Sequence, residues 1–207
     1  MTSIIWDFDG TLANSYPGMV AATQKALAEN FKIKISKDTI YNGIKETSIR
    51  KFVADLLEKN DDTSADDLDT FYKAYTLYER QFHDQIRLMP HAKISLDYLK
   101  SKKFDQFIVT HRDQSISDIA KKLGIADYFE EMVSVSDDFN RKPDPEMLNY
   151  LIDKYKLDPK DMFVIGDRKI DIDFGKSVLA KTILLSEDEE TDADYQIKSL
   201  NDLNGIL

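Results

Sequence analysis

Carboxylate side chains follow two apolar runs of this sequence in patterns that could support chemistry. The first run leads into Asp7-Phe8-Asp9-Gly10-Thr11, and a later one leads into Gly166-Asp167, with Asp171 four residues further on. Strand alternation would place Asp7 and Asp9 on one side, where two carboxylates repel each other unless a cation lies between them or one holds a proton. A strand-capping turn is the alternative for the first pattern, and an acid at a helix N-terminus is the alternative for Asp171 alone.

A hydroxyl and several basic side chains occur at two further places. Thr110 ends an apolar run and precedes His111 and Arg112, so its hydroxyl could donate to a phosphoryl oxygen while the next two side chains reach the rest of a substrate. Lys142 lies in Arg141-Lys142-Pro143-Asp144-Pro145, where the prolines stiffen the chain and Asp144 caps the helix that follows. Taken singly, a strand-end cap, a surface arginine and a lysine in a helix-entry loop are the ordinary alternatives.

Short apolar segments that alternate with helical patterns would position these groups. Central strands are predicted at Ser3 to Phe8, Gln106 to Thr110 and Met162 to Ile165, with weaker ones at Met132 to Val135 and Thr182 to Leu185. This alternation is typical of a parallel α/β sheet, here a Rossmann-like core. Because open α/β sheets bind ligands at the carboxyl ends of their strands, we expect the acids, the hydroxyl and the lysine at one edge of a single sheet.

The stretch from residue 15 to residue 87 has a different character, because its apolar side chains recur at helical spacing and strand signals are almost absent. Ser64 and Asp67 resemble a capping box at the start of a long helix. That helix carries an aromatic stripe, which predicts the core of a small bundle more readily than a ligand cage: Leu68, Phe71, Tyr75, Tyr78 and Phe82. We therefore predict a discontinuous α/β core of residues 1–14 and 88–207, with an inserted helical cap domain of residues 15–87.

Composition excludes several classes of function. The 207 residues are 42% apolar and 32% charged, as in ordinary folded proteins, and a net charge of −10 without a basic stripe opposes a nucleic-acid partner. No window approaches the roughly 18 apolar residues of a membrane helix and the N-terminus does not resemble a leader, so we expect a cytoplasmic protein without a membrane partner. Because cysteine is absent, oxygen or one of three histidines would hold any metal, which favours a hard cation such as Mg²⁺.

Taken together, the four places resemble the signature motifs of the haloacid dehalogenase-like phosphohydrolases. The matching residues are, in order, Asp7-Phe8-Asp9-Gly10-Thr11, Thr110, Lys142-Pro143, and Gly166-Asp167 with Asp171. The resemblance extends over nearly the whole chain and towards the phosphoglycolate-phosphatase-like branch through Pro90, Tyr128-Phe129 and Ala193-Asp194-Tyr195. The sequence departs from the family pattern at Asn14, His91 and Leu179, which bears on the subfamily more than on the reaction.

The resemblance implies a Mg²⁺-dependent phosphatase that hydrolyses a small phosphate monoester through a phospho-aspartyl intermediate on Asp7. It implies Asp9 as general acid and then general base, and Thr110 and Lys142 as the groups that hold the phosphoryl oxygens. It also implies a metal bound by Asp7, the backbone carbonyl of Asp9 and Asp167, with support from Asp171. Candidate substrate contacts are His111, Arg112 and Lys45, the last in Gly43-Ile44-Lys45, which resembles the substrate-facing loop of the family's cap. A solvated lysine at a helix end is the alternative for Lys45.

Other functions stay open at this point. Asp9 favours phosphate chemistry over dehalogenation, since a halide leaving group needs no proton. A phosphosugar mutase of the same family is the nearest alternative, followed by a receiver-like signalling module and a binding protein that kept the fold. Receivers lack Asp-x-Asp-Gly-Thr and the helical insertion, and the intact set of acids opposes a purely binding role. We expect a small phosphorylated metabolite as partner, and a monomer or homodimer.

Overall fold

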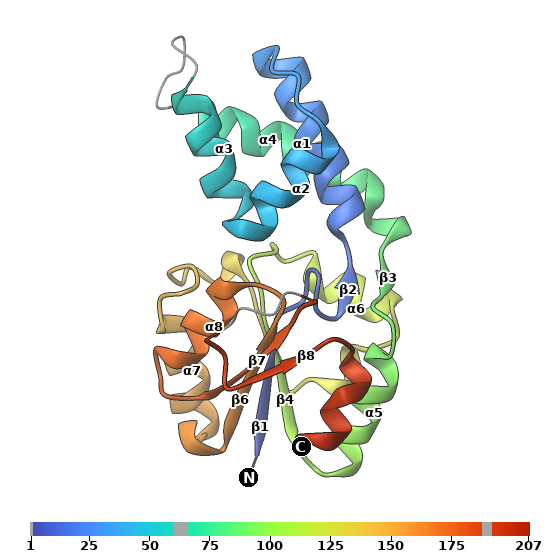
Figure 1. The fold of residues 1–207 in the computed structure, drawn as a ribbon, viewed down its shortest axis with the longest axis vertical. Helices are drawn as coiled ribbons and strands as arrows, with labels where there is room; N and C mark the ends of the chain where they lie inside the picture. Colours follow the sequence, from blue (N-terminus) through green and yellow to red (C-terminus); the bar gives the residue numbers. More distant parts are fainter. Residues whose placement is uncertain (1, 60–65, 188–191) are drawn as a thin grey trace. The chain divides into compact units, whose positions relative to one another are not determined.

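The computed structural model describes the chain outside residues 1, 60–65 and 188–191. Two compact units are present: one combines the residues up to Asn14 with Arg87–Leu207, and the other is Ser15–Ile86 (Figure 1). Separate roles for these units, as catalytic core and cap, stay a prediction. Within the described ranges, no helix has both the length and the apolar character that crossing a membrane requires.

A six-stranded parallel sheet forms the centre of the first unit, which confirms the predicted α/β fold class. Its strand order is β5-β4-β1-β6-β7-β8, and every neighbouring pair is parallel. The strands are β1 (Ser3–Trp6), β4 (Asp105–Val109), β5 (Glu131–Val133), β6 (Met162–Gly166), β7 (Lys181–Leu185) and β8 (Tyr195–Ile197). β1 is buried along its whole length, as its position between β4 and β6 requires.

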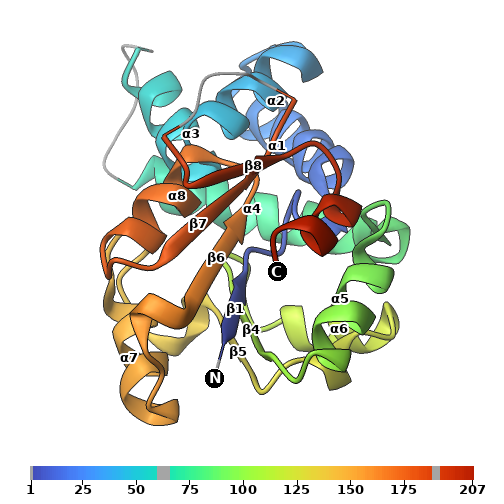
Figure 2. The ribbon, with the colours of Figure 1, turned by 60° about the horizontal axis from the view of Figure 1, so that its bottom comes forward.

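Helices cover both faces of this sheet. They are α5 (Ala92–Ser101), α6 (Ile116–Lys122), α7 (Glu146–Tyr155) and α8 (Lys169–Lys176), with short 3₁₀ turns at Ala126–Tyr128, Val135–Asp137, Pro159–Asp161 and Leu200–Gly205. Figure 2 shows α7 and α8 on one side of the sheet and α5 and α6 on the other. On the α7/α8 side, Leu148 and Phe174 pack with Ile5, Phe107 and Val164 in one buried cluster. On the other side, the indole N–H of Trp6 donates to the side chain of Gln106 at 3.1 Å and joins β1 to β4.

The five predicted strands are all present, each within two residues of its predicted ends. The start of α7 differs by one residue from the predicted cap, because Pro145 is the N-cap; Asp144 precedes it and accepts from the Glu146 N–H at 3.0 Å. β8 was not predicted, since a strand of three residues carries too little periodicity to recognise.

Helices make up the second unit: α1 (Tyr16–Phe31), α2 (Lys37–Glu46), α3 (Ile49–Glu58) and α4 (Asp67–Glu79), followed by a 3₁₀ turn at Arg80–Gln85. Most of the predicted aromatic stripe belongs to a core: Phe71 is fully buried with Leu27 and Val53, and Leu68, Tyr75 and Tyr78 pack against that cluster. Phe82 lies beyond α4, in the 3₁₀ turn. The capping box predicted from Ser64 lies outside the described residues.

The loop that the family resemblance suggested at Gly43-Ile44-Lys45 is wrong, because these residues lie inside α2; Lys45 is in its last turn, as the helix-end alternative predicted. Close helix packing explains the glycine: a Cβ at Gly43 would lie 2.1 Å from a ring carbon of Phe52 on α3. Gly43 is therefore a contact point between two helices and not a sign of a flexible loop.

A small antiparallel ribbon in the first unit joins the two ends of the inserted segment. β2 (Ala13–Asn14) pairs with β3 (Arg87–Leu88), in the register Ala13 opposite Leu88 and Asn14 opposite Arg87. Two-residue strands have no detectable pattern in sequence, and neither was predicted. The chain thus leaves the first unit and returns to it at neighbouring positions.

Candidate active site

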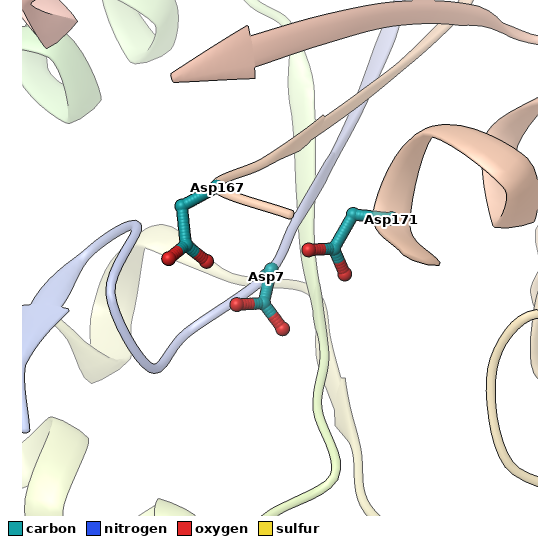
Figure 3. Close-up of side chains that lie close together, drawn as sticks. All are labelled: Asp7, Asp167 and Asp171. Atoms are coloured by element: carbon teal, nitrogen blue, oxygen red, sulfur yellow. The ribbon is translucent and has the colours of Figure 1, made fainter. Parts of the chain in front are cut away.

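Three aspartates converge where β1 and β6 end. Asp7 follows β1, Asp167 follows β6, and Asp171 lies in the first turn of α8. A carboxylate oxygen from each lies within 4.8 Å of the other two, and all three residues are buried. Figure 3 shows the three side chains pointing toward one another. The N–H of Asp7 donates to the carbonyl of Ile165 at 2.8 Å, which holds the residue beside β6.

Lys142 joins this group from the segment that precedes α7. Its Nζ donates to Oδ1 of Asp7 and to Oδ1 of Asp171, each at 2.8 Å. The lysine side chain is 2% exposed, so these contacts are made away from bulk water. The sequence prediction placed Lys142 in a fixed position near the acids, and the structure brings these residues together.

Burial and charge control the protonation of this group. Burial raises the pKa of Asp7 to about 7, and the charge of Asp171 adds to the rise while Lys142 and Arg168 oppose it. Burial works against the charged form of Lys142, but Asp171 and Asp7 outweigh it and hold its pKa above the usual value. The lysine is therefore charged at neutral pH, whereas the raised pKa of Asp7 favours its protonated form more than in an ordinary aspartate.

The acidic residues fit a hard divalent cation. Oδ2 of Asp7 and Oδ2 of Asp171 are buried and have no hydrogen-bond partner within the described residues. Buried carboxylate oxygens without a partner are costly, and oxygen ligands of this type are those that Mg²⁺ takes in proteins. Asp7, Asp167 and Asp171 could hold such an ion. The carboxylate of Asp9 is not part of this group, and a ligand role for its backbone carbonyl stays a prediction.

Asp9 forms a separate buried ion pair with Arg112. The Nη2 and Nε atoms of Arg112 both donate to Oδ1 of Asp9, at 2.6 and 3.1 Å. The sequence pattern made Asp7 and Asp9 neighbouring carboxylates that repel each other. In the structure they pair with different cations, Asp7 with Lys142 and Asp9 with Arg112.

Thr110 follows β4 and is 1% exposed. Its hydroxyl oxygen accepts from the N–H of Arg112 at 3.0 Å. Because that bond uses an oxygen lone pair, the hydroxyl proton stays available for an acceptor, such as an oxygen of a phosphoryl group. This geometry is compatible with the predicted role of Thr110.

His111 and Lys45 are the other two residues that were predicted to contact the substrate. Burial, followed by the charges of Lys142, Arg141 and Arg168, lowers the pKa of His111 to about 2, so its imidazole is neutral at physiological pH. A neutral ring cannot attract a phosphate as a cation would. Lys45 belongs to the second unit, at the end of α2, with its Nζ 5.5 Å from the ring centre of Tyr16. The structure does not place it relative to the aspartates.

Sequence reasoning missed three contributors to the site. Arg168 is buried next to Asp167, and its charge lowers the pKa of Asp7. Thr11 donates from its hydroxyl to Oδ1 of Asp167 at 3.4 Å. A Cβ at Gly166 would lie 2.2 Å from the Cβ of Asp171, so glycine is needed for that acid to approach β6. Thr11 and Gly166 lie in motifs that were recognised in the sequence, but no role was predicted for either. For Arg168, the available signal was the presence of a basic residue directly after Asp167.

Comparisons with known proteins match this arrangement to a family. The model of the haloacid dehalogenase-like hydrolases matches residues 4–185. A phosphoglycolate phosphatase of Vibrio vulnificus is 30% identical, over 82% of this chain and 76% of its own length. One from Neisseria meningitidis is 26% identical, over 97% of this chain and 91% of its own length.

A solved structure supports the fold. A predicted phosphoglycolate phosphatase from Haemophilus somnus superposes with a TM-score of 0.86 and 23% identity, covering 100% of this chain and 97% of the other. The expected family, fold and enzyme class are thus confirmed. This chain belongs to the haloacid dehalogenase-like hydrolase family, in its phosphoglycolate-phosphatase-like branch, and is a phosphatase of that family.

Proposed function

We propose that this phosphatase hydrolyses a small phosphate monoester with the help of Mg²⁺, through a phosphoryl group carried transiently on Asp7. The observation that supports this most is the state of the Asp7 carboxylate. One oxygen is held by Lys142 at 2.8 Å, and the other is buried without a hydrogen-bond partner among the described residues. A buried lysine fixes the orientation of this carboxylate, which suits a nucleophile.

Asp7, Asp167 and Asp171 would hold the metal, with the Asp9 carbonyl as a further predicted ligand. When bound, Mg²⁺ supplies positive charge that keeps Asp7 ionised and offsets the charge of the phosphoryl oxygens. Lys142 and Arg168 oppose three carboxylates, so a further cation would offset the remaining negative charge before an anionic substrate enters.

The proposed reaction has two displacements. In the first, an oxygen of Asp7 bonds to phosphorus, the ester P–O bond breaks, and Asp9 gives a proton to the leaving alcohol. In the second, a water oxygen bonds to phosphorus, Asp9 takes a proton from that water, and the bond to Asp7 breaks. The products are the alcohol and inorganic phosphate, with both acids in their starting states. Thr110 and Lys142 would hold the phosphoryl oxygens in both steps.

Relatives guide the choice of substrate. Those from Vibrio vulnificus and Neisseria meningitidis are named phosphoglycolate phosphatases, so phosphoglycolate is the first compound to test. Helical caps of the kind formed by residues 15–86 would select the part of the substrate beyond the phosphate. Lys45 remains a candidate for such a contact.

An activity panel tests the proposal. Purified protein is incubated with phosphoglycolate, sugar phosphates, nucleoside monophosphates and 4-nitrophenyl phosphate, with Mg²⁺ or with EDTA, and released phosphate is measured. We expect release that requires Mg²⁺ and is lost in Asp7→Asn. A folded protein that binds Mg²⁺ but releases phosphate from none of these compounds would contradict the proposal and favour a mutase or a binding role.

Trapping tests the intermediate directly. In Asp9→Asn the second displacement lacks its base, so a substrate with a good leaving group should leave phosphate on the enzyme. Mass spectrometry of the peptide that contains Asp7 would detect it. The absence of this adduct in a variant that still releases 4-nitrophenol would exclude Asp7 as nucleophile.

A further inference from the structure

The pairing of Arg112 with Asp9 gives this arginine a different task from the one that its sequence position predicted. As a residue directly after the Thr110-His111 pair, Arg112 was expected to contact the substrate. In the structure two of its donors meet at a single oxygen, Oδ1 of Asp9, and the arginine is 8% exposed. In the proposed function, Asp9 carries out both proton transfers.

Arg112 also contacts Thr110, to which the proposed function gives a phosphoryl oxygen. Its backbone N–H donates to the Thr110 hydroxyl at 3.0 Å while its guanidinium holds Asp9. Arg112 thus contacts both Thr110, which follows β4, and Asp9, which follows β1. A planar guanidinium restricts the orientation of a carboxylate more than a lysine ammonium does, because its donors are fixed relative to one another.

We propose that Arg112 is a positioning residue that holds the carboxylate of Asp9 ready to take the proton of the attacking water. This rests on the proposed function. Two donors of the guanidinium on one carboxylate oxygen fix the orientation of Asp9. In that step the water oxygen bonds to phosphorus, its proton moves to Asp9, and the P–O bond to Asp7 breaks. Arg112 forms no bond to the substrate.

Separating the two displacements tests this role. With 4-nitrophenyl phosphate the first displacement needs no acid, since 4-nitrophenolate is a stable leaving group, and kcat/KM reports only the steps up to its departure. In Arg112→Ala we expect kcat to fall about 10-fold to 100-fold, as part of the effect of a well-placed general base, while kcat/KM for this substrate changes little. Phosphate should accumulate on Asp7, seen as a burst of 4-nitrophenolate and as the corresponding peptide adduct.

Two further variants sharpen the test. Arg112→Lys keeps the charge but loses the fixed pair of donors, so it should recover only part of kcat. In an Asp9→Asn background, Arg112→Ala should have no further effect on kcat, because the two residues act as one unit. If Arg112→Ala does not fold, as judged by thermal unfolding, Arg112→Lys and Arg112→Gln carry the same comparison.

Several outcomes would overturn the inference. An equal fall of kcat/KM for all substrates with kcat unchanged would make Arg112 a substrate contact. A fall of kcat that persists in the Asp9→Asn background would show that it acts elsewhere. Failure of the wild-type protein to turn over any substrate, with no adduct on Asp7, would instead refute the proposed function on which the inference depends.

Discussion

Lys142 contacts two buried carboxylates. It donates to both Asp7 and Asp171 at 2.8 Å, so Lys142→Ala would remove this cation from two acids at once. We expect turnover to fall about 10²-fold to 10³-fold, as on loss of a preorganised donor. The free energy of unfolding should fall by about 3 kcal/mol, the lower end for a broken buried pair, because Asp7 can take up a proton instead. Steady-state kinetics and denaturant unfolding measure the two effects.

A surface lysine gives the matched control. Lys154 pairs with Glu131 at 2.8 Å, but its side chain is 46% exposed. Lys154→Ala should change the unfolding free energy much less than Lys142→Ala does, because water screens the exposed pair, and should leave turnover unaltered. Similar losses of unfolding free energy and turnover in Lys142→Ala and Lys154→Ala would mean that the burial of Lys142 has no effect on either.

The raised pKa of Asp7 predicts how stability depends on pH in the absence of metal. Its ordinary value is 3.8 and its folded value is about 7, so between these limits the folded protein holds a proton that the unfolded chain has lost. Stability contributed by this group is therefore lost as pH rises from about 4 to about 7, by at most about 1.4 kcal/mol per pH unit, and is constant above.

Comparison with Asp7→Asn isolates this effect, because the amide does not titrate. In EDTA, the unfolding free energy of the variant relative to wild type should increase from pH 5 to pH 7 and then level off. Saturating Mg²⁺ should make this free-energy difference vary less with pH, since bound metal favours the ionised carboxylate. A difference that does not vary with pH in EDTA would show that Asp7 titrates below this range.

At the scale of secondary structure, the approach of α8 to β6 fixes the position of Asp171. A Cβ at Gly166 would lie 2.2 Å from the Cβ of Asp171, a distance that the structure cannot accept without moving the helix. Gly166→Ala should therefore lower both stability and Mg²⁺ affinity, measured by thermal unfolding and by calorimetric titration. Gly205→Ala is the control, because a Cβ there meets nothing within 4 Å. Unchanged Mg²⁺ affinity in Gly166→Ala would argue against Asp171 as part of the metal site.

The elements that sequence predicted best were those with long, continuous patterns. The buried central strands and the helix carrying Phe71 have apolar patterns that can be recognised in a single sequence. The ribbon of β2 and β3 and the helical state of Gly43 did not follow from sequence, because each depends on a partner distant in the chain. The same holds within the site. Residue types and strand ends predicted Asp7, Lys142 and Asp167 as neighbours, whereas the partner of Arg112 required three-dimensional structure.

At the scale of the whole molecule, the β2–β3 ribbon predicts that the first unit can fold without the insertion. Asn14 and Arg87 are directly opposite each other, so a two-residue Asn-Gly turn could replace residues 15–86. The cluster around Phe107, Val164 and Phe174 lies wholly within the first unit. We expect the shortened chain to unfold cooperatively on heating, with a midpoint that Mg²⁺ raises.

Controls for the shortened chain distinguish a folded site from a collapsed one. The increase in midpoint with Mg²⁺ should disappear when Asp7→Asn is added to it. If residues 15–86 select the substrate, hydrolysis of phosphoglycolate should fall more than hydrolysis of 4-nitrophenyl phosphate. Loss of cooperative unfolding would mean that the first unit requires the insertion for its stability.

The contact between Gly166 and Asp171 also bears on which ion the acids admit. α8 lies close to the sheet at a second glycine as well, since a Cβ at Gly175 would lie 2.6 Å from a methyl carbon of Thr182. Outward movement of a helix packed at two such points would lose van der Waals contacts at both, so lengthening a bond from Asp171 to a larger ion would cost free energy. Ca²⁺ needs longer bonds and more ligands than Mg²⁺. Discrimination by ionic radius would then originate in the packing of a helix on a strand, and not in the carboxylates themselves.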